Sequence, residues 1–374
     1  MIFTINGQYL SKGLNIIASS LSTRVNLTIL NNILIEALES RVKITATDLE
    51  TATSFIMPAK IETEGVATVP ARSFIDFFNA LTGEVKVSVS DNMVKVEGEG
   101  NSASFNSQPA SDFPVIPDVG ESPDLVFDFK DFTQKLSHVI FSSATDQSRP
   151  ILTGVLFSFT KDQLELVATD SFRLSYEVIK GDFAKIGNER IVIPSSTLST
   201  IIKLTPAGAD GEAAQVKMWR LKEGKQVVFE IDSTRIVSKI LEGEYPAWEK
   251  IVPSAFTTEM KAGREEFLKA VKLSAVFARD SGNIVKLSLK NVKEGEMTLM
   301  ANTREIGENT SNVPVKIKGP GGEIAFNYRY LADILNILGD EEVSFSMIES
   351  LNPGKFSGAS SDFFHIIMPV RVQN

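Results

Sequence analysis

The stretch Arg149–Ser175 reads RPILTGVLFSFTKDQLELVATDSFRLS, and it decides the fold. Apolar and polar residues alternate through 154–159 and again through 164–167. This pattern predicts two antiparallel strands joined by a turn at Lys161-Asp162. A Thr-Asp pair then closes the second strand.

The same cassette occurs elsewhere in the chain. Residues 30–48 start at a leucine and end at an aspartate 18 positions later (48 − 30), as residues 152–170 do (170 − 152). A weaker copy covers 285–303, again 18 positions (303 − 285). Self-similarity at a fixed period is the mark of a repeated architecture. The 374-residue chain is therefore predicted to hold three copies of a unit of about 120 residues.

Amphipathic segments lie before and after each cassette and predict helices at 8–20, 71–82, 130–142, 195–205, 264–279 and 327–338. Proline-rich or glycine-rich linkers follow at 109–123 and 243–253. We therefore expect an α+β fold with helices packed on antiparallel sheets, in three domains at 1–120, 127–248 and 254–374. Neighbouring units can pair their edge strands, which favours a curved or closed assembly.

Composition excludes several classes of protein. The chain has no cysteine and two histidines, so disulfides and thiolate chemistry are excluded and a metal site is not expected. No apolar run approaches the roughly 20 residues that span a bilayer. The start, MIFTINGQYL, lacks the features of an export signal, so we expect a cytoplasmic protein without membrane partners.

The net charge of −9 argues against a protein that simply coats nucleic acid, but the charge is unevenly distributed. The six predicted helices carry ten cations and five acids, a net of +5, which leaves −14 for the remainder. Lysines on solvated helix faces would be the ordinary explanation. A shared positive helix surface would instead contact a phosphate backbone without reading bases.

Catalysis is the main alternative class. Asp48 and Asp170 recur at the same place in two repeats and could act as acid or base, but such residues more often cap turns after strands. The chain has no phosphate-binding glycine loop and no serine-histidine pair, and 319–322 is interpreted as a turn. We expect a non-catalytic protein that needs no cofactor.

Several collinear motifs carry a resemblance to a known family: TDLE at 47–50, VPAR at 69–72, RPILTG at 149–154, ATDSFRL at 168–174, GEYPAW at 243–248 and IIMPVR at 366–371. Over its whole length the chain resembles the bacterial DNA polymerase III beta subunit, the sliding clamp. The resemblance implies a ring of two chains arranged head to tail, with helices lining a hole for duplex DNA. It also implies that DNA polymerase and clamp-loader subunits dock through short linear peptides. A monomeric three-repeat scaffold that does not encircle DNA is the alternative.

The resemblance also implies site residues. The peptide pocket, between the second and third domains, would contain Arg149, Leu152, Thr169, Ser171, Phe172, Arg173, Leu174, Pro246, Lys250, Ile251, Tyr330, Ile366, Ile367, Met368, Pro369, Val370 and Arg371. The chain departs from the family pattern at two of these, with phenylalanine at 172 in place of histidine and lysine at 250 in place of arginine. The residues alone leave an alternative open, in which the last strand simply completes the third sheet.

Two further sets follow from the resemblance. DNA would be contacted by Arg24, Arg72 and Arg149. The dimer interface would join Phe105 and Ser107 of one chain to Val276 and Phe277 of the other. Solvated surface is the alternative for the arginines, and core packing is the alternative for the interface residues.

Overall fold

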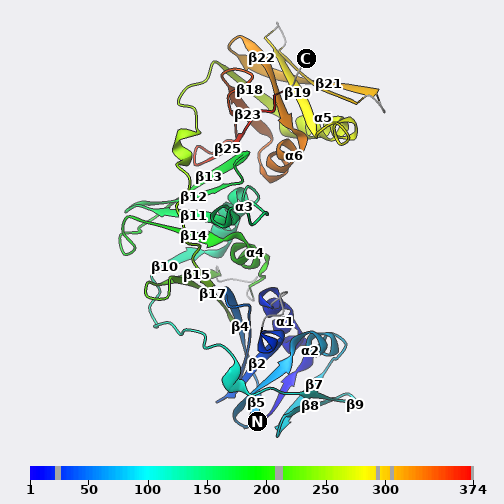
Figure 1. Ribbon diagram of the computed structural model, residues 1–374, viewed down its shortest axis with the longest axis vertical. Helices are drawn as coiled ribbons and strands as arrows, with labels where there is room; N and C mark the ends of the chain where they lie inside the picture. The colour runs from blue at the N-terminus through cyan, green and yellow to red at the C-terminus, as the bar shows by residue number, and fades with distance from the viewer. Residues whose placement is uncertain (22–26, 207–213, 292–294, 304–306, 372–374) are drawn as a thin grey trace. The chain divides into compact units, whose positions relative to one another are not determined.

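The computed structural model describes residues 1–21, 27–206, 214–291, 295–303 and 307–371. These residues form two compact units (Figure 1). Unit 1 comprises 1–132 and 199–240, and unit 2 comprises 133–198 and 241–374. The three predicted domains were drawn from sequence repeats, whereas the two units are defined by their compactness. The units therefore do not test the predicted boundaries, which stay a prediction.

The described residues contain six α-helices, each at a predicted place: α1 Gly7–Ile17, α2 Ala71–Asn79, α3 Phe129–Ile140, α4 Ser195–Lys203, α5 Arg264–Ala278 and α6 Tyr328–Ile337. The side chains of Asn6 and Asn327 accept backbone N–H groups in the first turns of α1 and α6. Such caps satisfy donors that a helix start leaves unpaired. The division into units passes through α3 and α4.

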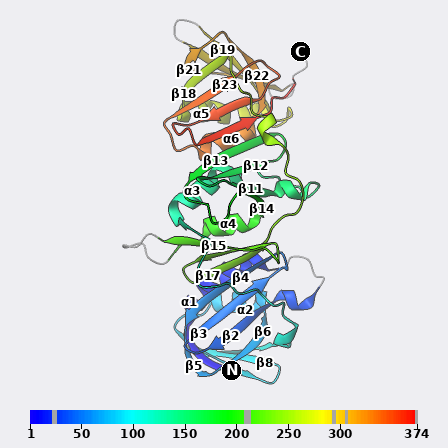
Figure 2. The same cartoon turned by 90° about the vertical axis from the view of Figure 1, so that its left-hand side faces the viewer.

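Unit 1 holds two antiparallel sheets, whose strands are visible in both views (Figures 1 and 2). One has the order β5-β1-β7-β8-β9 and the other β10-β15-β16-β17-β4-β3-β2-β6. The strands are β1 Ile2–Asn6, β2 Asn32–Leu38, β3 Arg41–Thr47, β4 Thr51–Pro58, β5 Lys60–Thr63, β6 Gly65–Pro70, β7 Glu84–Ser90, β8 Met93–Gly98, β9 Asn101–Asn106, β10 Leu125–Asp128, β15 Gln215–Leu221, β16 Gln226–Ile231 and β17 Thr234–Lys239.

Unit 2 holds one extended sheet with the order β14-β11-β12-β13-β25-β24-β23-β18-β21-β20-β19-β22. Its strands are β11 Gly154–Phe159, β12 Gln163–Thr169, β13 Arg173–Lys180, β14 Glu189–Pro194, β18 Thr258–Gly263, β19 Ile284–Lys290, β20 Glu296–Thr303, β21 Gly307–Lys318, β22 Gly321–Asn327, β23 Glu342–Met347, β24 Gly354–Ser357 and β25 Phe363–Ile367.

The predicted pairing of edge strands between neighbouring repeats is confirmed inside each unit. In unit 1, β17 pairs antiparallel with β4, so a strand of the central repeat extends the sheet of the first repeat. In unit 2, β13 pairs with β25 and joins the central repeat to the third. Each pairing gives an otherwise exposed strand edge its hydrogen bonds.

The predicted hairpins are present, but the third copy differs in detail. The β2-β3 and β11-β12 hairpins turn at 39–40 and 160–162, each after a short 3₁₀ turn. In the third hairpin, β19 ends at Lys290 and β20 begins at Glu296, so the two strands are further apart in the sequence. Val285 lies within β19, whereas Leu30 and Leu152 precede their strands. The spacing of 18 positions in the third copy is therefore counted from a residue inside a strand, whereas in the other two copies it is counted from a residue before the strand.

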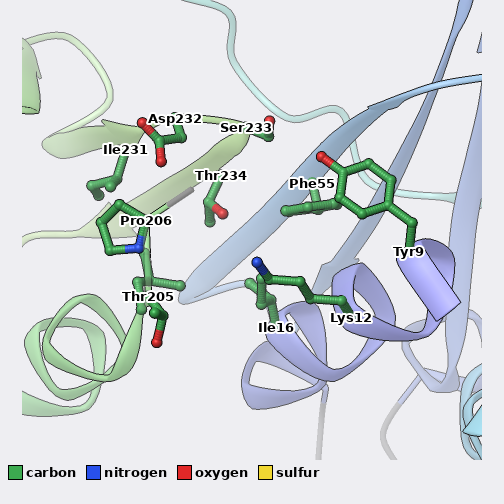
Figure 3. Close-up of a pocket in the computed structure, with 11 residues that line it drawn as sticks. Tyr9, Lys12, Ile16, Phe55, Thr205, Pro206, Ile231, Asp232, Ser233 and Thr234 are labelled. Atoms are coloured by element: carbon green, nitrogen blue, oxygen red, sulfur yellow. The ribbon is translucent and has the colours of Figure 1, made fainter. Parts of the chain in front are cut away.

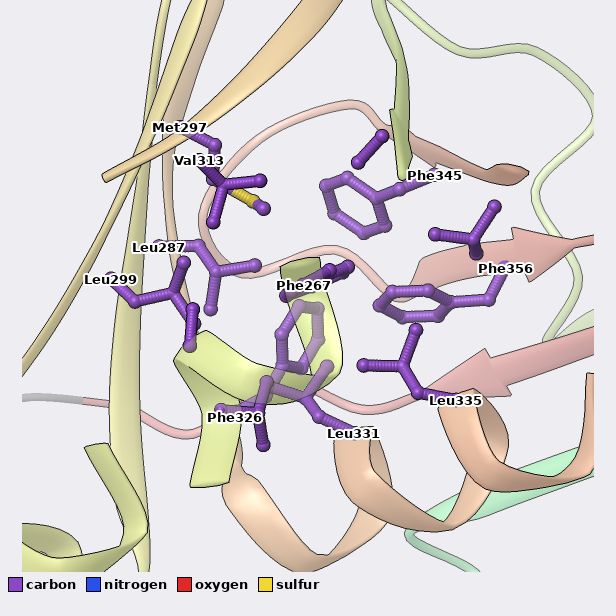
Figure 4. Close-up of a cluster of buried hydrophobic side chains, with 14 of the residues drawn as sticks. Phe267, Leu287, Met297, Leu299, Val313, Phe326, Leu331, Leu335, Phe345 and Phe356 are labelled. Carbon is purple, nitrogen blue, oxygen red and sulfur yellow. The ribbon is translucent and has the colours of Figure 1, made fainter. Parts of the chain in front are cut away.

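Each unit has its own apolar core. In unit 1, Leu10, Leu14 and Ile17 of α1 are buried with Phe74 and Phe78 of α2. In unit 2, α5 and α6 contribute to a cluster that Figure 4 shows, where phenylalanine rings from helix and strands meet. Rings of Phe326, Phe345 and Phe356 contact one another, with centroids 4.7–5.9 Å apart. The core faces match the helical spacing predicted from the sequence.

None of the helices in the described part of the chain is both long enough and apolar enough to cross a bilayer.

Candidate functional site

The two Thr-Asp pairs close the same turn in two repeats. Asp48 Oδ1 accepts the N–H groups of Glu50 and Thr51 at 3.0 and 2.7 Å. Asp170 Oδ1 accepts those of Phe172 and Arg173 at 2.9 and 3.0 Å. Both carboxylates therefore hold a turn, as expected of aspartates after strands.

The threonines of these pairs repeat the pattern. Thr47 Oγ1 donates to the carbonyl of residue 51, and Thr169 Oγ1 donates to the carbonyl of residue 173. The repeat-equivalent residues Leu49 and Ser171 adopt φ values of 74° and 79°. These positive values cost free energy in a residue other than glycine. The hydrogen bonds of the neighbouring threonine and aspartate side chains hold the backbone in this conformation.

A pocket of about 340 Å³ opens in unit 2 beside the second of these turns. Its wall combines the 3₁₀ turn that starts at Pro150 with the residues that follow β12. It contains five predicted peptide-site residues: Arg149, Leu152, Ser171, Phe172 and Arg173.

Sequence reasoning missed the rest of the wall, which is Ser143, Ala144, Thr145, Asp146, Ser148 and Asp170. Most of them follow α3, and the N–H of Ala144 donates to the carbonyl of Leu152 at 2.9 Å, which fixes this loop beside the 3₁₀ turn. The polar run SSATDQS before Arg149 was the available signal.

The mouth of the pocket carries an arginine and an aromatic ring. Arg149 is exposed, and its Nη1 donates to Ser171 Oγ at 3.1 Å. Phe172 is 62% exposed although it is a large apolar side chain. An exposed aromatic ring next to a pocket is typical of a binding surface. The buried Leu152 supplies an apolar floor.

Arg173 is already engaged within the protein. Its guanidinium pairs with Asp170 at 3.0 Å and with Asp333 of α6. It also lies 4.6 Å from the ring centroid of Tyr330 and 5.4 Å from that of Phe141. Since its side chain is only 12% exposed, Arg173 holds α6 against β13 and has little free capacity to bind a ligand.

The last strand, β25, lies inside the sheet, between β24 of the third repeat and β13 of the central repeat. Its register pairs Arg173 with Ile367 and Leu174 with Ile366. Both isoleucines are fully buried. After β25 the chain continues beside the residues that precede β13, where the N–H of Met368 donates to the carbonyl of Phe172 at 2.8 Å.

The residues after β25 are more accessible than the strand. Met368, Pro369 and Val370 are half-buried, and Arg371 is exposed. The N–H of Val370 donates to the carbonyl of Ala325 at 2.8 Å, which fixes this segment on unit 2. It therefore lies beside the Phe172 turn with side chains still able to contact a ligand.

An apolar cluster unites other predicted residues. Leu174 and Ile366 pack with Trp248, and Ile251 lies against them. Pro246 and Lys250 are exposed on the same segment of chain. Of the remaining predicted residues, Thr169 is buried and Tyr330 half-buried. The structure thus gathers the predicted residues in unit 2, with some forming the core and others its surface.

A buried histidine lies behind this surface. His365 is fully buried, and its Nδ1 is 2.7 Å from Ser175 Oγ, which in turn is 2.7 Å from Ser142 Oγ. Burial, with a smaller contribution from the positive charge of Arg173, lowers the pKa of His365 well below its usual value. The ring is therefore neutral near neutral pH.

The second histidine belongs to a buried ion cluster. Glu177 is 3% exposed at its side chain and accepts from Lys135 at 3.2 Å and His138 at 2.7 Å. Both partners are on α3, so the cluster ties this helix to β13. In the repeat-equivalent places of unit 1, 122 positions earlier (170 − 48), the chain has Phe55, Gly13 and Ile16. One repeat therefore uses charges where another uses apolar side chains.

The structure describes two of the three arginines that are predicted to contact DNA. Arg72 is exposed on α2, and Arg149 is exposed at the pocket mouth. Arg24 lies outside the described residues. Most other helix cations are exposed too: Lys12, Lys130, Lys203, Lys269, Lys272, Arg279 and Arg329. Lys135 and Arg264 differ, because each is partly buried and contacts a carboxylate.

The predicted dimer residues lie at strand edges and on a helix. Phe105 is on β9, where its ring contacts Phe74 and Phe77 with centroids 5.2 and 5.7 Å away. The hydroxyl of Ser107, just after β9, accepts the N–H of Thr68. In the described part of unit 1, β9 pairs only with β8, so its other edge is open.

In unit 2 the corresponding residues are on α5. Val276 is 50% exposed, whereas Phe277 is half-buried and packs on the core. Leu273, one turn earlier on α5, is 49% exposed, and sequence reasoning missed it. Ser274 of α5 donates to Asn309 of β21 at 3.0 Å. Among the described residues, the 307–314 part of β21 pairs only with β20, so it too has an open edge.

A second, smaller pocket lies in unit 1 between α1 and the turn that joins β16 and β17 (Figure 3). Tyr9, Lys12 and Ile16 of α1 face Asp232 and Thr234 across it. Its volume of about 30 Å³ is less than a tenth of the 340 Å³ of the pocket beside the Phe172 turn.

Within the described ranges, no group of three or more histidine, aspartate or glutamate side chains could hold a metal ion.

Comparisons with known proteins identify the family. Three family models match in order: the N-terminal, central and C-terminal domains of the DNA polymerase III beta subunit, at 1–117, 127–247 and 249–371. The beta sliding clamp of Chlamydia pneumoniae is 28% identical over all of both chains, and that of Synechocystis is 25% identical over 98% of each. The crystal structure of the DNA polymerase sliding clamp from Bacillus subtilis superimposes with a TM-score of 0.93 over all of both chains, at 25% identity. These matches confirm the resemblance seen in the sequence and the three-domain clamp fold, and the chain belongs to the DNA polymerase III beta subunit family.

Proposed function

We propose that this chain is a sliding clamp, a non-catalytic ring that encircles duplex DNA and tethers the replicative polymerase and other clamp-binding proteins. The observation that carries the proposal is the match to all three domains of the family over nearly the whole chain. The domains of the proposed ring are 1–120, 127–248 and 254–374, and the proposed location is the cytoplasm.

Ring closure needs two chains joined head to tail. The open edge of β9 in one chain is proposed to pair with the open edge of β21 in the other, which extends both sheets. The exposed Leu273 and Val276 on α5 lie next to β21 and supply an apolar contact for Phe105 and Ser107 of the second chain. Because two different edges meet, the contact is heterologous and closes only if the rotation is correct.

Contact with DNA is proposed to be weak and independent of sequence. Exposed cations on the helices, among them Arg72, supply positive charge in a chain of net charge −9. Such contacts bind phosphates and release counterions, so they weaken with salt. A closed ring tolerates weak contacts, since it cannot leave a circular duplex sideways.

Partner proteins are proposed to dock an extended peptide on unit 2. The 340 Å³ pocket beside Leu152, the exposed Phe172 and the half-buried Met368–Val370 segment offer apolar contacts, and Arg149 offers donors. Methionine adapts its shape to different ligands. A polymerase held this way gains processivity, because tethering raises its effective concentration at the primer end.

The oligomeric mass in solution, measured together with retention on nicked circular DNA, tests the proposal. We expect twice the mass of the chain, and loss of both the dimer and the retention in a Val276→Asp variant. Val126→Asp is the matched control, because Val126 is also about half exposed but lies on β10 in unit 1. A wild-type mass of one chain would favour the monomeric scaffold.

A further inference from the structure

Three buried polar side chains are linked in a row behind the pocket of unit 2. Nδ1 of His365 lies 2.7 Å from Ser175 Oγ, which lies 2.7 Å from Ser142 Oγ. All three residues are fully buried. They join β25, β13 and the turn after α3, which are far apart in the sequence.

Each of the three residues leads into the proposed peptide surface. Ser142 directly precedes the loop 143–148, most of which lines the pocket. Ser175 lies on β13, whose first residue also lines the pocket. His365 lies on β25, close to its end and just before the segment 368–371 that lies beside the Phe172 turn. The hydrogen-bonded row therefore connects the chain segments that form the two sides of this surface.

Unit 1 contains the same pair of hydroxyls without the histidine. The repeat-equivalent residues of the two serines are Ser20 and Thr53, 122 positions earlier (142 − 20 and 175 − 53). Their side-chain oxygens are also buried and 2.7 Å apart. Thr53 is paired with Ile236 of β17, whereas the second serine is paired with His365 of β25. Two hydroxyls at this place therefore satisfy each other without an imidazole.

The histidine has a cost that an apolar side chain would avoid. Nε2 of His365 is buried and, among the described residues, has no hydrogen-bond partner. A buried polar atom without a partner destabilises the folded state. Ile236 fills the equivalent place in unit 1 without this cost. Packing alone therefore does not explain a histidine at position 365.

We propose that His365 is a positioning residue for peptide docking, which acts through Ser175 and Ser142 to hold the loop 143–148 and the segment 368–371 in one relative arrangement. The inference rests on the proposed docking of partner peptides on unit 2. His365 does not touch the peptide, because it is fully buried. Without its hydrogen bond the two sides adopt more arrangements, and the apparent affinity falls with the fraction of molecules that can bind.

Two substitutions of His365 in the full chain separate positioning from packing. His365→Ile copies unit 1, so it keeps an apolar side chain and removes the hydrogen bond to Ser175. His365→Asn has an amide that reaches as far as Nδ1 and can donate or accept, but it leaves part of the space of the ring empty. Affinity is measured by fluorescence anisotropy with a labelled synthetic peptide that copies the clamp-binding segment of the organism's own replicative polymerase.

The two variants should differ in opposite directions in affinity and in stability. We expect His365→Ile to bind the peptide about five-fold more weakly, which converts to about 1 kcal/mol, the net value of one hydrogen bond. Its melting temperature should be at least that of the wild type. His365→Asn should bind nearly as well as the wild type but melt at a lower temperature, because of the cavity. A histidine that served only packing would give the same order in both measurements.

The repeat supplies a matched control. Ser175→Ala and Thr53→Val each remove one hydroxyl from an equivalent buried pair, in unit 2 and unit 1 respectively. Ser175→Ala should weaken peptide binding by at least about five-fold. Thr53→Val should leave peptide binding unchanged. Wild-type affinity in His365→Ile, or an equal loss of affinity in Thr53→Val, would overturn the inference.

Failure of the inference is distinguishable from failure of the proposed docking. If the wild-type chain and both variants of His365 bind the peptide equally well, the docking stands and the positioning role is wrong. If the wild-type chain does not bind the peptide, the proposed docking is wrong and the positioning role is wrong with it.

Discussion

The buried carboxylate of Glu177 gives a quantitative prediction for the stability of unit 2. Glu177→Gln removes a charge that is 3% exposed, and it leaves His138 without an ion-pair partner. Lys135, 20% exposed, keeps only its hydrogen bond to the carbonyl of Val178. Removal of one partner from a buried ion pair costs about 3 to 5 kcal/mol. Because Lys135 keeps some solvent, we expect the lower end, about 3 kcal/mol of the free energy of unfolding of unit 2.

Denaturant unfolding followed by tryptophan fluorescence measures this cost. Trp248 packs in unit 2 and Trp219 in unit 1, so a Trp219→Phe background reports on unit 2 alone. The matched variant uses the residues of the first repeat, Glu177→Phe, His138→Ile and Lys135→Gly, because a Cβ at the equivalent Gly13 would lie 2.4 Å from the ring of Phe55. It should unfold near the wild-type midpoint, since well-packed apolar groups often replace a buried ion cluster without loss. A wild-type midpoint for Glu177→Gln would refute the reasoning.

The remaining predictions concern pH, docking and assembly. The pKa of His365 is lowered in the folded state, so as the pH falls the unfolded chain binds the proton first. The contribution of His365 to the free energy of unfolding is therefore constant above the unfolded pKa of about 6.5. Below that pH the free energy of unfolding falls by up to about 1.4 kcal/mol per pH unit. Denaturant titrations should show this slope in the wild type and a smaller one in His365→Gln, and equal slopes would contradict the assignment. Leu152→Asp should abolish binding of a clamp-binding peptide in a calorimetric titration without change in oligomeric mass, whereas undiminished binding would place the peptide elsewhere. Leu273→Asp should dissociate the dimer as Val276→Asp does, and a sedimentation mass still equal to two chains would remove α5 from the interface.

Much of the fold could be predicted, because the helices and hairpins follow from the local spacing of apolar residues. Apolar spacing on α1 and α2 placed the helices and their buried faces, and the alternation at 154–167 placed the central hairpin. The third hairpin was aligned less well, because β19 and β20 are further apart in the sequence than the strands of the other two hairpins, although the strand order is the same. An equal number of residues between two positions does not show where the strands end and the turn begins between them.

The site was harder to predict because it depends on pairs that are far apart in the sequence. Ser175 and His365 are 190 positions apart, and Arg173 and Asp333 are 160 apart. No local pattern reveals such pairings, so the sequence could not show that Arg173 is held by α6 and that His365 is buried. The wall residues Ser143–Ser148 were missed for a similar reason, since only the folded 3₁₀ turn brings them beside Ser171.

Release of the protein when circular DNA is cut tests most directly whether two chains close around a duplex. The protein is loaded onto a nicked circle, washed at a salt concentration that removes non-specific binding, and its retention is measured before and after one restriction cut. We expect stable retention on the circle and rapid release from the linear product, whose ends let a ring slide off. Retention that is the same before and after the cut would contradict ring closure.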